Sequence, residues 1–185
     1  MRTLLVLDID KTLCDSRELD KWLPAKSSGD MTDWWNAINK SDLPVVSGAT
    51  TGVQNLLDTL QPVKVLLLTS RTNVIFDATA NWVERNFPTL PVRQGRFASL
   101  SMREPTDHSS VLASKKKRLA KYKRLYEVDR VVVVDDEAVM NGLLIGKHDR
   151  FIQIKNCKWN KKDYTELHAR VVELADTRVL GTRAE

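Results

Sequence analysis

Two carboxylates directly follow an apolar run in Thr3-Leu4-Leu5-Val6-Leu7-Asp8-Ile9-Asp10-Lys11-Thr12. The run itself is typical of a strand that is buried on both faces, because it does not alternate between polar and apolar residues. Asp8 and Asp10 then stand at the carboxyl end of this strand, where open parallel sheets bind their ligands. Two aspartates can also cap an ordinary strand-to-loop turn, so their meaning depends on the rest of the chain.

Apolar runs and helical patterns alternate along the chain, which favours a parallel sheet with helices on both faces. Strands are expected at Thr3–Leu7, Val63–Leu68, Phe97–Met102, Arg130–Val134 and Phe151–Ile154. Helices are expected at Thr51–Leu60, Asn73–Asn86, Ser110–Tyr126 and Asp163–Ala175. With 42% hydrophobic residues the chain can build a full core. We therefore predict an α/β, Rossmann-like fold in which residues 1–185 form a single domain.

Residues 14–48 do not follow this alternation, and we expect them to form a small, partly helical cap insertion over the site. The segment holds three tryptophans together with prolines and glycines. Trp34 and Trp35 have two interpretations: they stack on a base of a nucleic acid, or they pack the insertion itself.

The net charge of the chain bears on its binding partners, and its cysteine content bears on its cellular location. A net charge of +5 suits a polyanionic partner such as nucleic acid, and it also suits a basic protein whose Lys and Arg side chains are simply solvated. Cys14 and Cys157 lack metal-ligand spacing, so reduced thiols and a cytoplasmic location are expected. No apolar stretch reaches the roughly 20 residues that span a membrane, and Asp8 and Asp10 interrupt any signal-peptide core.

Asp8 and Asp10 have the residue types and spacing for phosphoryl transfer. Asp8 would attack phosphorus in line and form an acyl-phosphate. Asp10 would protonate the leaving oxygen and then deprotonate the water that hydrolyses the intermediate.

A second group of polar residues, Thr69-Ser70-Arg71, follows the apolar run Val65–Leu68. A hydroxyl and backbone N–H groups at a strand end form a phosphate cradle, with Thr69 as the hydroxyl that bonds the phosphoryl oxygen. Arg71 would hold a substrate phosphate through two hydrogen bonds. The same residues also fit an ordinary helix N-cap.

The basic run Lys115-Lys116-Lys117 divides by helical phase. One helical stripe contains Leu112, Lys115, Leu119, Tyr122 and Tyr126. Lys115 therefore points inward, while the next two lysines are turned by about 100° and 200° from it. Lys115 would neutralise the nucleophile and the transferring phosphoryl group. The alternative is a run of lysines that are all solvated.

Asp135 and Asp136 follow the apolar run Val131–Val134. Two acids at a strand end are costly unless a cation neutralises them, and Mg²⁺ takes oxygen ligands from one or two carboxylates. Asp8, the backbone carbonyl of Asp10 and one acid of this pair would hold the metal. Acids at the start of a helix, where the helix dipole favours them, are the alternative.

These groups occur in the order found in the haloacid dehalogenase superfamily of phosphatases, which residues 3–136 resemble. The pattern of that superfamily is D-x-D-x-T, a hydroxyl behind a strand, a lysine and paired acids behind a strand. The resemblance implies a Mg²⁺-dependent phosphomonoesterase that works through an aspartyl-phosphate.

A narrower resemblance is to the 3′-phosphatase domain of bacteriophage polynucleotide kinase-phosphatase. Met102-Arg103, Asp107 and Lys115 are similar to that family's approach to its lysine, with the same separation of twelve residues from Arg103 to Lys115. Thr69-Ser70-Arg71 is similar to its Ser-Gly-Arg, and Asp33-Trp34-Trp35 is similar to its Asp-Trp segment. The resemblance implies that Ser70, Arg71 and Arg103 bind substrate, and that the phosphate comes from a nucleic-acid or nucleotide 3′ end.

The chain departs from that family at several positions. Ser109 and Val111 stand where the family usually carries Arg and Asp, and Lys11 replaces the commoner Gly. No phosphate-binding loop of a kinase is present, because Gly142–His148 is too short and lacks the hydroxyl, so no ATP-binding kinase site is expected. Three functions remain open: a polynucleotide 3′-phosphatase, a small-molecule or nucleotide phosphatase, and a nucleic-acid-binding domain without turnover.

Overall fold

The computed structural model describes residues 1–23, 31–40, 42–162 and 165. Its strands are β1 (Thr3–Leu7), β2 (Lys64–Thr72), β3 (Ala98–Arg103), β4 (Arg130–Asp135) and β5 (Arg150–Gln153). Its α-helices are α1 (Thr32–Lys40), α2 (Ala49–Leu60), α3 (Phe76–Asn86) and α4 (Val111–Tyr126). Its 3-10 helices are η1 (Arg17–Trp22), η2 (Asn73–Ile75) and η3 (Ala138–Leu143). Apart from Thr165, the expected helix Asp163–Ala175 lies outside the described residues.

The five strands in the described ranges form one parallel sheet in the order β3-β2-β1-β4-β5. The central strand β1 has Leu7 level with Leu67 of β2 on one side and with Val134 of β4 on the other. This order places a change of direction between β1 and β4, where Rossmann-like sheets open a crevice at their carboxyl edge. The predicted α/β, Rossmann-like fold is confirmed.

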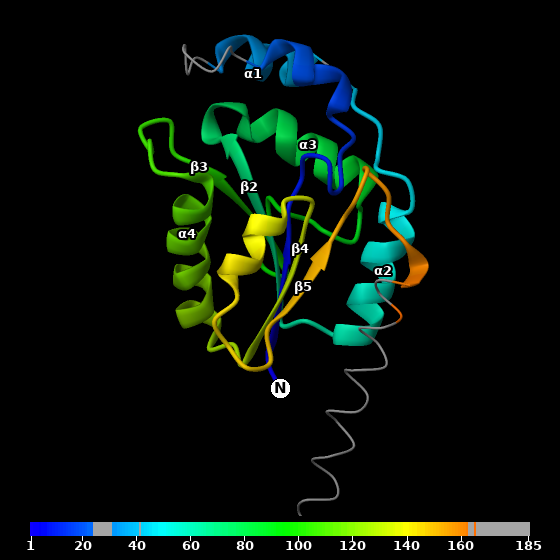
Figure 1. Cartoon of the computed structure of the whole chain (residues 1–185), viewed down its shortest axis with the longest axis vertical. Coiled ribbons are helices and arrows are strands. Elements are labelled where there is room, and N and C mark those ends of the chain that lie inside the picture. Colours follow the sequence, from blue (N-terminus) through cyan, green and yellow to red (C-terminus); the bar gives the residue numbers. More distant parts are fainter. Residues whose placement is uncertain (24–30, 41, 163–164, 166–185) are drawn as a thin grey trace, which may run out of the picture.

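Helices cover both faces of the sheet, with α4 on one side and α2 on the other (Figure 1). Successive residues of a strand point to opposite faces, so Leu5 and Leu7 pack with the residues of α2 and α3, whereas Leu4 and Val6 pack with those of α4 and η3. Full burial of such a side chain stabilises the fold by about 1.5–3 kcal/mol. Within the described ranges, no helix is long and apolar enough to cross a membrane.

The segment 14–48 contributes η1 and α1, and α1 lies beside α3 beyond the carboxyl ends of the strands (Figure 1). Trp34 is buried and meets Trp35 edge to face, with ring centroids 4.7 Å apart. The indole N–H of Trp82 in α3 donates to the Leu43 carbonyl at 2.7 Å. Trp34 therefore packs within the protein, whereas Trp35 is partly exposed.

Trp159, near the end of the described chain, packs between the loop behind β1 and helix α2. Its indole N–H donates to the Thr12 carbonyl at 2.7 Å, and its ring lies on α2. A Cβ atom at Gly52 would come within 2.1 Å of Cε3 of Trp159. Only glycine lets helix and ring approach this closely.

Candidate active site

The carboxyl edge of the sheet brings together acids that lie far apart in the sequence. Asp8 directly follows β1, and Asp135 is the last residue of the neighbouring strand β4. The backbone N–H of Asp8 donates to the Val134 carbonyl at 2.9 Å, which continues the parallel pairing. Because the strands are in register, both side chains emerge at the same point.

Lys115 lies between these two acids. Its Nζ donates to Asp8 Oδ1 and to Asp135 Oδ2, each at 2.7 Å, and all three side chains are buried. Burial works against the charge of the lysine, but the two carboxylates outweigh it and raise the pKa of Lys115. The structure places Lys115 inward, as the helical phase indicated.

Asp8, Asp135 and Asp136 form an acidic cluster, in which one oxygen from each residue lies within 4.8 Å of the others. Burial raises the pKa of Asp8 and of Asp135, although Lys115 opposes the rise in both. Burial also raises the pKa of Asp136 to about 6, with further contributions from the charges of Asp8 and Glu137. Burial therefore opposes ionisation of all three acids, and a bound cation would favour it.

This donor set fits Mg²⁺. When all three acids are ionised, they and Lys115 carry a net charge of −2, which a divalent cation would balance. All the donors are oxygens, the kind that Mg²⁺ prefers. Asp135 already accepts from Lys115 and from the Glu137 backbone N–H (3.0 Å), whereas Asp136 is half-buried at the wall of the cleft. The carboxylate of Asp10 is not part of the cluster, so a contribution from this residue would come from its backbone, as the sequence analysis expected.

Arg71 has a different partner from the one expected. Its Nε and Nη2 donate to the two carboxylate oxygens of Asp10 at 2.9 and 2.8 Å, and Nη1 donates to Thr79 Oγ1 at 3.3 Å. The side chain is 2% exposed. The two hydrogen bonds expected to go to a substrate phosphate thus go to Asp10, and Arg71 fixes the orientation of this carboxylate.

Thr69 and Ser70 differ from their expected places as well. The sequence suggested that a strand ends at Leu68, but β2 continues to Thr72, and its register with β3 is irregular between Leu68 and Thr72. Thr69 is fully buried and its hydroxyl accepts the backbone N–H of Arg71 at 3.1 Å. Ser70 lines the cleft and Thr69 does not. The hydroxyl available to a phosphoryl group is therefore that of Ser70.

Arg103 ends β3 and holds the loop that leads to α4. Its Nε donates to the Asp107 carbonyl at 2.9 Å, and its Nη2 donates to the Ser109 carbonyl. The Asp107 carboxylate lies 3.8 Å from Nε of Arg103. Arg103 lines the cleft, and its contact with substrate stays a prediction. The hydrogen bonds to the loop already hold its side chain in place.

Except for Thr69, the predicted site residues all line one cleft of about 810 Å³. Its wall also contains residues for which the sequence predicted no function, among them Asp20, His108 and Glu137. Lys11, at φ +60°, reaches Asp20 of η1 with its Nζ at 2.9 Å. This pair ties the loop behind β1 to the segment 14–48. No local motif marks Asp20, because its role depends on how the insertion folds back.

Comparisons with known proteins find only a distant structural similarity. No family model and no curated protein matches it. Among solved structures, a crystal structure of a CbbY mutant from Rhodobacter sphaeroides in complex with xylulose-1,5-bisphosphate is similar, with a TM-score of 0.49 and 10% identity. The match covers 86% of this chain and 90% of that chain. At this level of similarity it carries no argument about activity.

Proposed function

We propose that this protein is a Mg²⁺-dependent phosphatase of the haloacid dehalogenase superfamily that works through an aspartyl-phosphate. The observation that carries the proposal is the buried bridge of Lys115 between Asp8 and Asp135, with Asp10 close by in the same cleft. A purely structural lysine would not require two acids that burial makes costly to ionise.

The chain's own residues supply each step of the reaction. Asp8 attacks phosphorus through Oδ2, because Oδ1 is held by Lys115, and the bond from phosphorus to the leaving oxygen breaks. Asp10 gives its proton to that oxygen. Asp10 then takes a proton from water as the water attacks the acyl-phosphate, which releases inorganic phosphate and regenerates Asp8.

Electrostatics explain the remaining contacts of the site. Lys115 keeps positive charge beside the nucleophile, where the phosphoryl group adds negative charge. Ser70 offers a hydroxyl at the cleft wall, and Arg71 keeps Asp10 in position. Mg²⁺, held by Asp8, Asp136 and the Asp10 backbone, would neutralise the phosphoryl oxygens.

The substrate we propose is the 3′-phosphorylated end of a polynucleotide. The net charge of +5 and the position of Arg103 at the cleft wall support this choice. A small phosphorylated metabolite or nucleotide is the second candidate. It is favoured by the apolar side chains that the segment 14–48 brings to the cleft, including Leu23, Met31 and Trp35, because they could enclose a small ligand.

Phosphate release tests both candidates. The substrates are matched oligonucleotides with a 3′- or a 5′-phosphate and a mononucleotide, each with and without Mg²⁺. The proposal predicts Mg²⁺-dependent release chiefly from the 3′-phosphorylated oligonucleotide, abolished in Asp8→Asn and retained in the control Asp58→Asn, an exposed acid of α2. Faster release from the mononucleotide would select the second candidate. Equal rates in Asp8→Asn and the parent would overturn the aspartyl-phosphate chemistry.

A further inference from the structure

A second cavity, of about 620 Å³, lies beside the reaction cleft. Its wall comes from the start of α3, from β3 with the loop that follows, and from α4. Glu104, Asp107 and His108 line both this cavity and the reaction cleft. A ligand long enough to pass these residues could therefore occupy both spaces at once.

Helix α4 gives this second cavity three cationic side chains: Lys117, Arg118 and Lys121. Lys117 and Lys121 are exposed, and among the described residues neither makes an ion pair. The two acids in the wall, by contrast, already have partners. Glu104 accepts from Asn73 Nδ2 at 2.8 Å, and Asp107 accepts from the Ser109 hydroxyl at 2.5 Å and lies near Arg103. The wall of the cavity thus holds three cationic and two acidic side chains, and its net charge is positive.

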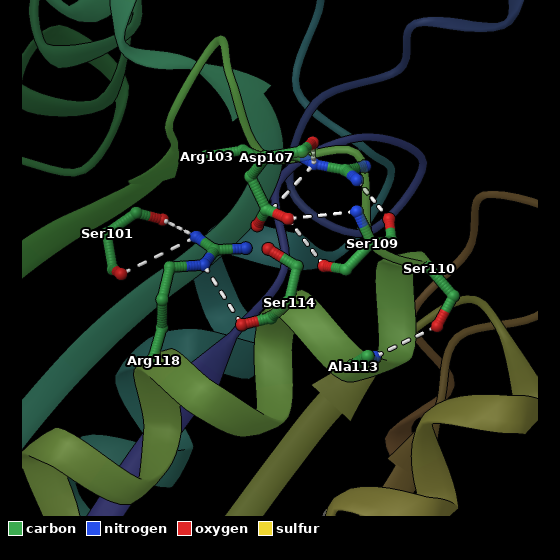
Figure 2. Close-up of polar contacts among 8 residues, drawn as sticks. All are labelled: Ser101, Arg103, Asp107, Ser109, Ser110, Ala113, Ser114 and Arg118. Carbon is green, nitrogen blue, oxygen red and sulfur yellow. Dashed lines mark hydrogen bonds and ion pairs between the residues drawn. The ribbon is translucent and has the colours of Figure 1, made fainter.

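Arg118 is the fixed member of this group. Its Nη1 donates to the Ser101 carbonyl at 2.7 Å, so that the guanidinium spans from α4 to β3 (Figure 2). Its Nη2 is buried and has no hydrogen-bond partner among the described residues. Burial lowers the pKa of Arg118 to about 10, although nearby Asp107 opposes this. A buried donor without a partner is costly, and the hydrogen bond of Nη1 to β3 keeps the cationic group of Arg118 in place at the cavity wall.

Apolar and aromatic side chains complete the wall. Phe76 and Tyr122 are only partly buried there. Tyr122 is held by stacking on Tyr126, with ring centroids 6.3 Å apart and planes inclined by 11°. Cationic side chains that follow a phosphate backbone, combined with aromatic surfaces for bases, are the usual means of binding single-stranded nucleic acid.

We propose that the second cavity binds a phosphodiester of the substrate strand through Lys117, Arg118 and Lys121, while the terminal phosphate reacts at Asp8. A neighbouring base would lie against Phe76 or Tyr122. This inference rests on the proposed function and extends it: the strand would run from the reaction cleft past Asp107 and His108 along α4.

The test compares the double variant Lys117→Ala/Lys121→Ala with a matched control, Lys116→Ala/Arg124→Ala. The control removes two exposed cations from the same helix that do not line the cavity. For each protein, kcat/KM is measured on a 3′-phosphorylated decanucleotide and a 3′-phosphorylated dinucleotide. We expect the ratio of decanucleotide to dinucleotide to fall about tenfold or more in the first variant, since each lost contact to a charged group weakens binding. The control should keep the parental ratio.

Binding is measured separately, by fluorescence anisotropy of a labelled decanucleotide with a 3′-hydroxyl. The dependence of log Kd on log salt concentration should become shallower by about 0.7 in Lys117→Ala/Lys121→Ala, the amount expected for one phosphate contact on a single strand. Equal ratios and equal salt slopes in the two double variants would overturn the inference.

The two proposals can fail independently. If the parent hydrolyses no oligonucleotide, the proposed function is wrong, and the anisotropy alone decides about the cavity. A loss of binding confined to Lys117→Ala/Lys121→Ala would then still support a nucleic-acid site. If the parent hydrolyses the decanucleotide and both double variants behave alike, the proposed function stands and the second site is wrong.

Discussion

Replacing Arg71 by lysine tests whether this residue acts on substrate or through Asp10. The guanidinium makes two hydrogen bonds to the Asp10 carboxylate, at 2.8 and 2.9 Å, and a third to Thr79. Lysine keeps the positive charge, but a single ammonium group cannot reproduce two parallel bonds to one carboxylate. Arg71→Lys therefore frees the orientation of Asp10 and leaves the net charge of the site unchanged.

The size of the effect follows from these contacts. Arg71 is buried, and the Asp10 side chain is 22% exposed, so the loss of one charge-assisted hydrogen bond costs roughly 1.5–3 kcal/mol of folding stability. Displacing a reacting group by about 1 Å lowers the rate about 10²-fold. Asp10→Asn removes the proton-transferring group itself, which is typically worth about 10²–10⁴-fold.

A double-mutant cycle on kcat separates the two roles of Arg71. If Arg71 acts through Asp10, adding Arg71→Lys to Asp10→Asn lowers kcat little beyond Asp10→Asn alone, because the group it positions is already inactive. Urea unfolding of each variant checks that folded protein is compared. Arg85→Lys is the control, an exposed arginine that pairs with Asp42, and neither of these residues lines the cleft. If the losses in kcat multiply in the double variant, or if Arg71→Lys changes KM alone, Arg71 does not act through Asp10 and instead binds substrate.

Three other outcomes are expected. Lys115→Met removes the cation that Asp8 and Asp135 share, so activity should fall at least about 10²-fold. The free energy of unfolding measured in urea should fall by roughly 3–5 kcal/mol. A variant as stable as the parent would contradict the buried bridge. The melting temperature of the metal-free protein should rise as the pH falls through about 6. Burial raises the carboxyl pKa values of the acidic cluster, so the folded state takes up protons at a higher pH than the unfolded state does. Saturating Mg²⁺ should flatten this dependence, and a flat profile without metal would count against the cluster. Gly52→Ala should lower stability by about 1–3 kcal/mol, because its Cβ would collide with Trp159, and an unchanged urea midpoint would contradict that packing.

The framework of the site was predictable from the sequence because it depends on two periodicities. Parallel strands in register bring their carboxyl ends to one edge, so Asp8 and Asp135 had to lie close together once two buried strands were recognised. Helical phase then selected Lys115 from three consecutive lysines. Regular strand and helix geometry is enough to place these three residues together.

Contacts that depend on where an element ends were not predictable in the same way. The expected end of the strand at Leu68 made Thr69 the natural hydroxyl, but β2 continues to Thr72 with an irregular register, and Ser70 lines the cleft. The pairing of Arg71 with Asp10 joins two loci 61 residues apart. No local sequence pattern near either residue indicates that the two pair, so a substrate phosphate was the only evident partner of Arg71 from the sequence alone.

Helix α4 shows how one basic run can serve two spaces. A residue in a helix is turned by about 100° from its predecessor, so Lys115 enters the reaction cleft while Lys117 and, one turn further, Lys121 face the second cavity. The inward lysine is fixed by two acids, and the outward pair has no such partner among the described residues. If the helix were basic only for solubility, replacing Lys117 and Lys121 would have the same consequence as replacing Lys116 and Arg124. A strand bound along α4 requires the two replacements to differ.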